Sequence, residues 1–566
     1  MRHLFQTISA LTKFFWRSRL EVLLFILIIP AVSDLLAPGF FPMHDDLQVF
    51  RLYELHKCVL DGQIPCRWVP DAGFGYGYPL MQFYPPMPYY PMELMVLLGF
   101  GFFWPVKIMF ALSFIISGLG MYLLAKQFFG KWGGLLSAVL YIYAPYHSVD
   151  VYVRGAMNEA WGMAWFPFVL LFIYLLIKKP SRRNIIFLSL ALLFQLTSHN
   201  VMTLVFAPAA IIWAIFWMWR ERSLKAVKDL FFSGLLGVGL SAFFFIPVVL
   251  EQKFVHVDSM MVGYFNYLAH FADIKQLFIS RFWGYGGSTW GPEDGMSFSV
   301  GQFQLITALV ASVMAVFKFK KQKSISAIVL IMVAFGFLYA FLTHSRSSFI
   351  WDRVAILQFA QFPWRLVALV VFFFSFASGY LASLSLPKIL KPLMYGILIA
   401  GIILWNLPFY KVDRHQRVTI EEKLAGLQWE LQVTGGIFDY LPRSAPKPPG
   451  APAFTYPQYQ EGYGGILHYR SGSNWIDFTA QVSSPSAKVM LPLYTFPGLV
   501  TKVDGVKTKT EIDPDLGRVV ISLNSGTHHI SSKIGYTPVR LFSDFLTLMS
   551  IYILIKLISD DRKHPA

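Results

Sequence analysis

Apolar runs of about 20 residues recur along this chain, separated by short polar connections. A helix of that length crosses a hydrocarbon core of about 30 Å. Of the 566 residues, 55% are hydrophobic and 14% are charged, whereas a soluble domain has about 25% charged residues. The sequence therefore predicts a polytopic α-helical membrane protein with about 12 spans.

The apolar runs give approximate boundaries for these spans. No small-residue cleavage site follows the first run, so we interpret it as an anchor and not as a signal peptide. Residues 88–104 are also apolar, but counting them as a span would move every later basic cluster to the other side; we therefore predict an interfacial or re-entrant helix there. The predicted spans are 20–38, 107–126, 133–147, 160–177, 184–198, 201–219, 230–250, 301–317, 325–342, 363–383, 389–408 and 541–557.

The positive charge of the chain follows the predicted spans. The formal net charge is +16, and the basic residues gather in short clusters, such as 178–183 and 318–323, between alternate spans. This distribution is typical of cytoplasmic loops. It predicts a plasma-membrane protein with both termini in the cytoplasm. Because the remaining segments are nearly neutral, the charge does not indicate nucleic-acid binding.

The order of the spans gives the expected domains. Residues 1–408 form a transmembrane domain with two large outer loops, 39–106 and 251–300. Residues 409–540 are richer in Pro and Gly and tend to alternate in polarity, which predicts a β-sandwich outside the membrane. Residues 541–566 then form the last helix and a cytoplasmic tail.

Two turns are expected within the β-rich region. Asp504-Gly505 lies between alternating runs, and this dipeptide favours the positive φ angles of a type I′ hairpin turn. The residues Asn524-Ser525-Gly526 indicate a second turn.

The first outer loop begins with His44-Asp45-Asp46, directly after the first span. Residues 47–60 carry their apolar side chains near one face, which predicts a short amphipathic helix along the membrane surface. Both cysteines of the chain, Cys58 and Cys66, lie in this loop. In an oxidising compartment they could form a disulfide; the alternative is two free thiols.

Polar residues gather where four separate loops meet the predicted outer boundary of the membrane. Ionisable residues are costly at that depth and usually have a function. We therefore expect these loops to converge on one site. The candidate residues are His44, Asp45, Asp46, Arg154, Glu159, His199, Asn200, Gln361 and Arg365.

Each candidate also has a purely structural interpretation. One of the two acids, Asp45 or Asp46, could cap the helix at 47–60. Arg154 and Glu159 could simply form an ion pair with each other. These alternatives stay open on the sequence alone.

The other loops have similar alternatives. His199 and Asn200 could be polar residues of a tight turn, and Arg365 could extend to the lipid headgroups. The aromatic residues of 74–86 are typical of an interfacial belt. No cluster of His and Cys indicates zinc, and no glycine-rich phosphate loop indicates a soluble nucleotide cofactor.

An acidic pair just after the first span, on a many-span chain with an outer C-terminal domain, resembles the GT-C superfamily of integral membrane glycosyltransferases. The resemblance is closer to one bacterial branch, called YfhO-like or "6-pyruvoyl-tetrahydropterin synthase-related" membrane proteins, and it covers most of the chain. No pterin-enzyme metal motif is visible. The runs that carry the resemblance are HDDLQVFRLYE, PCRWVPDAGFGYGYPLMQFYPPMPYY, RGAMNEAWGMAWFP, LTSHN, QFPWR and LPLYTFPGLVTKVDG.

This resemblance implies a function. The donor would be a sugar on a polyprenyl phosphate, and the acceptor would be a glycan, a lipid or a protein outside the cytoplasm. Asp45 or Asp46 would be the general base or a ligand of a divalent cation such as Mg²⁺ or Mn²⁺. Substrate binding would fall to His44, Arg154, Glu159, His199, Asn200 and Arg365.

Two other classes of function remain as alternatives. A transporter or flippase of lipid-linked sugars should carry ionisable residues near the middle of the membrane and show inverted repeats, and neither is visible in the sequence. A non-catalytic glycan-binding or assembly protein would depend on residues 409–540 and not on the acidic pair.

Overall fold

Two compact units make up the computed structural model of this chain, which describes residues 19–290, 293–385, 387, 389–427, 429–430 and 438–563. Unit 1 contains residues 1–46, 106–233 and 264–417, and unit 2 contains 47–105, 234–263 and 418–566. The basic residues Lys13 and Arg17, which precede the first predicted span, lie outside the described residues.

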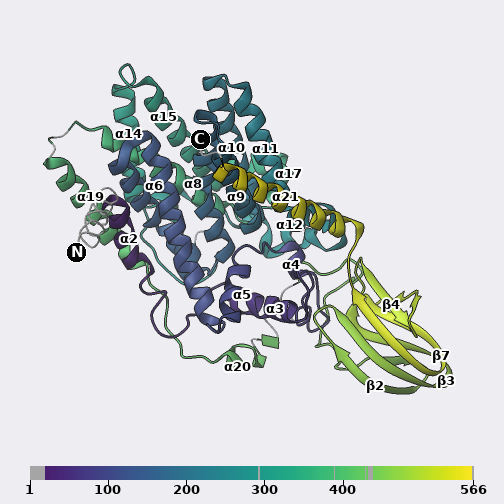
Figure 1. The fold of residues 1–566 in the computed structure, drawn as a ribbon. Coiled ribbons are helices and arrows are strands. Elements are labelled where there is room, and N and C mark those ends of the chain that lie inside the picture. Colours follow the sequence, from purple (N-terminus) through teal and green to yellow (C-terminus); the bar gives the residue numbers. More distant parts are fainter. Residues whose placement is uncertain are drawn as a thin grey trace, which may run out of the picture. The chain divides into compact units, whose positions relative to one another are not determined.

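Long helices are the main elements of the described chain (Figure 1). Seven of them are long and apolar enough to cross a membrane, or eight if the bent pair α11 and α12 is one span. The chain is therefore a multi-pass integral membrane protein. The main helices are α2 (Arg19–Val32), α6 (Phe103–Ile142), α8 (Met157–Lys178), α9 (Arg182–Ser198), α10 (Asn200–Glu221), α11 (Leu224–Leu240), α12 (Ala242–Glu251), α14 (Gln302–Phe317), α15 (Lys323–Thr343), α18 (Val367–Ser378), α19 (Leu390–Asn406) and α21 (Pro538–Lys563).

The helices lie where the spans were predicted, but the number of twelve stays a prediction. Helices α2, α9 and α14 have 14, 17 and 16 residues, which is short for a full crossing. The 40-residue helix α6 is interrupted at Gly130, where φ is 71°. A Cβ at Gly134 would lie 2.8 Å from the carbonyl oxygen of Tyr122, so the chain turns back at this break, between the two spans predicted there.

Two helices of unit 2 come from the first outer loop. Helix α3 (Gln48–Leu60) confirms the predicted amphipathic helix, although it also buries polar residues such as Gln48 and Glu54. Helix α5 (Tyr89–Leu97) has nine residues, or about 14 Å at 1.5 Å per residue, which is too short to cross a membrane. Shorter helices are α4 (Leu80–Phe83), α7 (Pro145–Ser148), α13 (Ile274–Phe278), α16 (Ser348–Arg353), α17 (Ala355–Gln358) and α20 (Ile420–Lys423).

The C-terminal β-rich region is one antiparallel sheet and not the predicted two-sheet sandwich (Figure 1). The long strands β3 and β7 pair along most of their length, from Trp475 with Lys533 to Tyr494 with Arg518. The shorter strands pair with one or the other of these two, or with each other, so all described strands share one hydrogen-bonded network. The strands are β1 (Gln458–Glu461), β2 (Gly464–Ser471), β3 (Trp475–Tyr494), β4 (Leu499–Val503), β5 (Val506–Thr508), β6 (Glu511–Ile512) and β7 (Arg518–Ile534).

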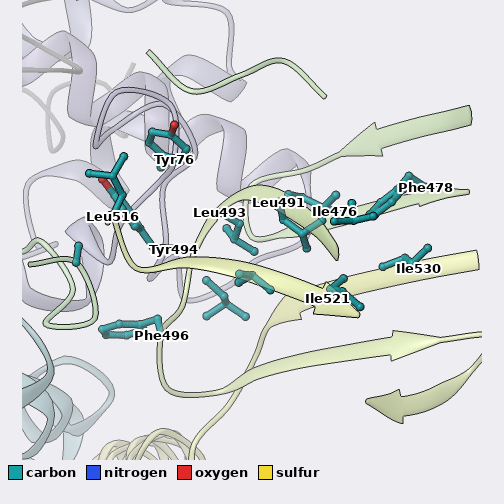
Figure 2. Packing of buried hydrophobic residues seen from close by; sticks show 14 of the residues in the cluster. Tyr76, Ile476, Phe478, Leu491, Leu493, Tyr494, Phe496, Leu516, Ile521 and Ile530 are labelled. Carbon is teal, nitrogen blue, oxygen red and sulfur yellow. The ribbon is translucent and has the colours of Figure 1, made fainter. Parts of the chain in front are cut away.

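The apolar face of this sheet is covered by loops and not by a second sheet. Alternate residues of β3 and β7, such as Phe478 and Ile521, are fully buried (Figure 2). Side chains of the first outer loop join the same cluster, among them Trp68 and Tyr76. The ring of Tyr76 lies 5.3 Å from that of Tyr494. Alternating polarity identified the buried face correctly, but it did not indicate what covers that face.

One of the two predicted turns is confirmed. Strands β4 and β5 form a hairpin around Asp504-Gly505, with φ angles of 52° and 82°, as a type I′ turn requires. The prediction at 524–526 was wrong, because these residues lie inside β7. Gly526, with φ of 133°, instead lies where the pairing of β3 with β7 shifts register.

Cys58 and Cys66 form a disulfide within unit 2. Both residues are buried. We expect replacement of both by Ser to lower the free energy of unfolding by about 2–3 kcal/mol, because the bond restricts the unfolded chain. Thermal unfolding in detergent measures the loss. As a control, a thiol reagent should label unfolded wild-type protein only after reduction; labelling without reduction would contradict the pairing.

Candidate active site

The predicted site residues come from four loops, and they lie together in unit 1. The first of these loops is the acidic segment after α2. The backbone N–H of His44 donates to Val153 O at 2.9 Å, and that of Asp45 donates to Arg154 O at 2.8 Å. These two bonds fix the acidic segment against the loop between α7 and α8.

The second loop contributes a tight turn between α7 and α8. Residues Val149–Val153 form one turn of π-helix, and Gly155 follows with φ of 66°. A Cβ at Gly155 would collide with Met43, which precedes the acidic segment. A glycine is therefore needed at this close approach, and the turn presents Arg154 and Glu159 to the same place.

Arg154 is the centre of a buried ion cluster. Its Nη1 donates to Asp150 and, at 2.9 Å, to Glu159 Oε2. Arg365 Nε lies 3.4 Å from the same Glu159 oxygen. The hydroxyl of Tyr146 donates to Glu159 Oε1 at 2.8 Å. The side chain of Glu159 is only 1% exposed and that of Arg154 only 4%, so the ions depend on each other for solvation.

The charges of the cluster influence one another. Burial, with the nearby Glu159 carboxylate, raises the pKa of Asp150 well above its usual value. Burial alone would lower the pKa of Arg154, but Glu159 and Asp150 outweigh it and raise that pKa. Arg154 contacts both carboxylates, whereas Arg365 contacts only Glu159. The cluster therefore places two guanidinium groups around one carboxylate, next to the acidic segment.

Asp45 lies within the field of this cluster. It interacts electrostatically with Arg154 and Arg365, and one of its oxygens is 3.0 Å from His44 Nδ1. The side chain of Asp45 is 44% exposed, so solvent or a substrate can reach it. The N-cap residue of α3 is Leu47, so neither acid occupies the N-cap position. Asp46 follows directly in the chain and is half-buried.

His199 and Asn200 come from the junction of α9 and α10. His199 is the N-cap of α10 and its Nδ1 accepts a hydrogen bond from Met202 N at 3.1 Å. Burial and the charge of Arg365 lower the pKa of His199 to about 3. The side chain is therefore a neutral hydrogen-bonding group and not a cation. Asn200 is the first residue of α10.

The titration of His199 should make stability depend on pH. Its folded pKa of about 3 lies below the ordinary histidine pKa of 6.5, so the unfolded chain takes up the proton first. The stabilisation is complete above pH 6.5 and is lost as the pH falls toward 3. We expect the free energy of unfolding to fall by up to about 1.4 kcal/mol per pH unit. Thermal unfolding from pH 7 to 4 measures this slope; His199→Asn, which keeps an N-cap acceptor, should reduce it, and an equal slope in both proteins would refute the assignment.

The fourth loop, QFPWR, is held in an uncommon conformation. Gln361 has a φ of 61°, and non-glycine residues with such angles cluster at functional sites. Arg365 Nη1 donates to Gln361 Oε1 at 2.8 Å and to Ala360 O at 2.9 Å. The turn therefore fixes the guanidinium beside Glu159.

Sequence reasoning missed the residues that support this site. The guanidinium of Arg154 stacks 4.5 Å above the ring of Trp364. Trp364 Nε1 donates to Ser288 Oγ, which donates in turn to Asp294 Oδ1 at 3.0 Å. His270 Nδ1 lies 2.8 Å from the same serine oxygen. Buried polar side chains of this kind have no motif, so spacing alone could not have identified them.

The glycine-rich part of outer loop 251–300 also reaches the site. A Cβ at Gly287 would lie 2.7 Å from His44 Nε2, so a glycine at this position allows the contact. The described residues contain no group of three His, Cys, Asp or Glu side chains placed to hold a metal ion.

A curated relative, an uncharacterised protein of Lactococcus lactis subsp. cremoris (strain MG1363), is 24% identical over 335 residues, which are 56% of this chain and 49% of the relative. The chain thus spans about half the length of the curated relative it matches.

Several solved structures are distantly similar. They are the mycobacterial arabinofuranosyltransferase AftD (TM-score 0.44, 14% identity, 70% of this chain and 26% of that one), the Archaeoglobus fulgidus oligosaccharyltransferase in the apo form (0.43, 10%, 78% and 62%) and ArnT of Cupriavidus metallidurans bound to undecaprenyl phosphate (0.39, 14%, 69% and 63%).

A family model covers part of the site. Residues 84–250 match the model of dolichyl-phosphate-mannose-protein mannosyltransferases, a family of membrane glycosyltransferases that use a sugar on a polyprenyl phosphate. The segment of this chain that matches that family contains Arg154, Glu159 and His199 of the candidate site.

Proposed function

We propose that this protein transfers a sugar from a polyprenyl-phosphate donor to an acceptor outside the cytoplasm, with inversion at the anomeric carbon. The observation that carries the proposal is the position of Asp45, which is held by the backbone of Arg154 beside a buried cluster containing two arginines. A base beside a cationic site fits an acceptor hydroxyl and a departing phosphate.

The reaction needs one proton acceptor. The acceptor hydroxyl attacks the anomeric carbon while the Asp45 carboxylate takes its proton. A new glycosidic C–O bond forms as the bond from the anomeric carbon to the phosphate oxygen breaks. The electron pair of the broken bond stays on the lipid phosphate, so atoms and charge balance. Attack from the side opposite the leaving group inverts the configuration.

The arginines provide stabilisation for the leaving group. The lipid phosphate gains negative charge as it departs, and fixed cations lower the energy of that state. Arg154 is held by Glu159, Asp150 and the ring of Trp364, and Arg365 by its own turn and Glu159. Because their positions are set before the reaction, little reorganisation is required. His199, as a neutral group, and Asn200 would contact polar atoms of the substrates.

Asp46 and a divalent cation have further roles available in this mechanism. Asp46 is adjacent in sequence and is the alternative base. Asp45 and Asp46 would hold such a cation, which would stabilise the same leaving phosphate. The polyprenyl chain would lie among the apolar helices and place its phosphate at the outer boundary of the membrane.

A transfer assay with defined donors tests the proposal. Purified protein in lipid nanodiscs is mixed with undecaprenyl-phosphate sugars, and mass spectrometry follows the release of undecaprenyl phosphate with and without a chelator. The expected result is release that depends on an added cell-envelope acceptor. Donor movement across vesicles without any release would favour a flippase and contradict the proposal.

A further inference from the structure

Unit 2 contains a polar cavity that does not belong to the candidate active site. It has a volume of about 220 Å³, far above the roughly 10–15 Å³ that one water molecule needs. Its walls come from the disulfide-closed loop, from the end of β7 and from the start of α21. The lining includes the cationic side chains Arg67, Lys533 and Arg540.

Arg540 is buried in the wall of this cavity, with 1% of its side chain exposed. Its Nε donates to Glu251 Oε2 at 2.9 Å, and its Nη1 donates to Gly535 O at 2.8 Å. Its Nη2 is buried and has no hydrogen-bond partner among the described residues. Arg540 lines the cavity, so its guanidinium charge would attract an anion there.

Arg67, in another wall of the cavity, has hydrogen bonds similar to those of Arg540. Its Nη2 donates to Asp544 at 2.7 Å, and its Nη1 donates to Phe243 O at 3.0 Å. Its Nε is buried and likewise lacks a partner within the described part of the chain. Each of the two arginines therefore has one guanidinium nitrogen without a partner among the described residues.

The nearby carboxylates are already engaged. Glu251 accepts hydrogen bonds from Arg540, from Gln82 Nε2 at 2.6 Å and from Thr537 Oγ1 at 2.5 Å. Asp61 accepts from the backbone N–H and the hydroxyl of Ser473, at 2.8 and 2.7 Å. These acids stabilise the walls of the cavity.

The loop that carries Arg67 is well fixed. Gln63 Oε1 accepts from the backbone N–H groups of Arg67 and Trp68, both at 2.9 Å. Gln63 Nε2 donates to Ser473 Oγ at 2.9 Å. Together with the disulfide, these bonds hold the loop in one conformation, so little order has to be gained on binding.

We propose that this cavity binds a phosphate ester. Guanidinium groups match phosphate oxygens in geometry and charge, and the exposed Lys533 adds a third cation at the cavity. Arg540 is near the start of α21, a candidate membrane span, so the ester is either the headgroup of an anionic phospholipid or a soluble glycerol phosphate. This site is independent of the proposed transfer reaction.

Two binding measurements on the full-length protein separate the sources. Isothermal titration with glycerol 1-phosphate tests the soluble ester. Native mass spectrometry from nanodiscs of phosphatidylglycerol or phosphatidylcholine tests the headgroup. Binding of glycerol 1-phosphate, or selective retention of phosphatidylglycerol alone, supports the proposal and names the source. If folded wild-type protein shows neither of these two results, the proposal is refuted.

Paired variants test the arginines without leaving a lone buried charge. Arg540→Gln with Glu251→Gln, and Arg67→Gln with Asp544→Asn, should each weaken binding about tenfold or more. Lys533→Gln, on the surface, should weaken it by about threefold and serves if a paired variant fails to fold. Lys507→Gln, exposed in the β4–β5 hairpin, is the matched control.

Equal affinity in the control and in all folded cavity variants would refute the site. Because transfer is not the readout, failure here is distinguishable from failure of the proposed function.

Discussion

Asp45→Asn is expected to reduce sugar transfer by about 10²–10⁴-fold while the protein stays folded. The substitution keeps the shape of the side chain but removes the group that would accept the proton. The bond that fixes this residue comes from its backbone N–H to Arg154 O, so the variant should retain its position. The turnover number in the transfer assay measures the effect, and thermal unfolding verifies the fold.

Asp46→Asn is the matched control for this prediction. If Asp45 is the base, Asp46→Asn should retain much more activity than Asp45→Asn. The reverse order would assign the base to Asp46. Full activity in both variants would remove acid–base chemistry from the acidic pair. A loss in both that added Mg²⁺ or Mn²⁺ partly restores would indicate that the pair holds a cation.

Glu159→Gln is expected to lower the free energy of unfolding by about 3–5 kcal/mol, as is typical when one partner of a buried ion pair is removed. The substitution leaves Arg154 and Arg365 buried without their shared carboxylate. Thermal or denaturant unfolding in detergent measures the change. Transfer should fall as well, because the arginines lose the group that orients them.

Glu221→Gln provides the matched comparison. Glu221 pairs with Lys178 at 2.6 Å, but both side chains are about 30% exposed. An exposed pair contributes about 0–1 kcal/mol. A loss at Glu159 no larger than the loss at Glu221 would show that the cluster is not held together by its charges. Replacing Arg365 by Gln together with Glu159→Gln should recover part of the lost stability.

Some features of this protein could be predicted because they depend on nearby residues. Each apolar run corresponds to a helix, since a helix that buries its backbone polar groups is the stable form of such a run in lipid. The Asp504-Gly505 hairpin was predictable because these two residues readily adopt positive φ angles. The amphipathic helix at 47–60 was predictable from its apolar periodicity.

Other features depend on contacts between distant segments. The sandwich was expected because alternating strands must bury one face. In the structure, loops carrying Trp68 and Tyr76 cover that face, and the alternation of the strands contains no information about them. Asn524-Ser525-Gly526 has the composition of a turn, but pairing with β3 on both sides keeps it inside β7.

The candidate site shows the same division. The sequence by itself determined that this is a many-span membrane protein, and it singled out four loops with ionisable residues, because hydropathy and charge act over short stretches of chain. Only the tertiary structure decided that Glu159 joins Arg154 to Arg365, that Asp150 and Trp364 complete the cluster and that His199 is neutral. Those properties arise from burial and from the electrostatic fields of residues far away in the chain, which no local pattern encodes.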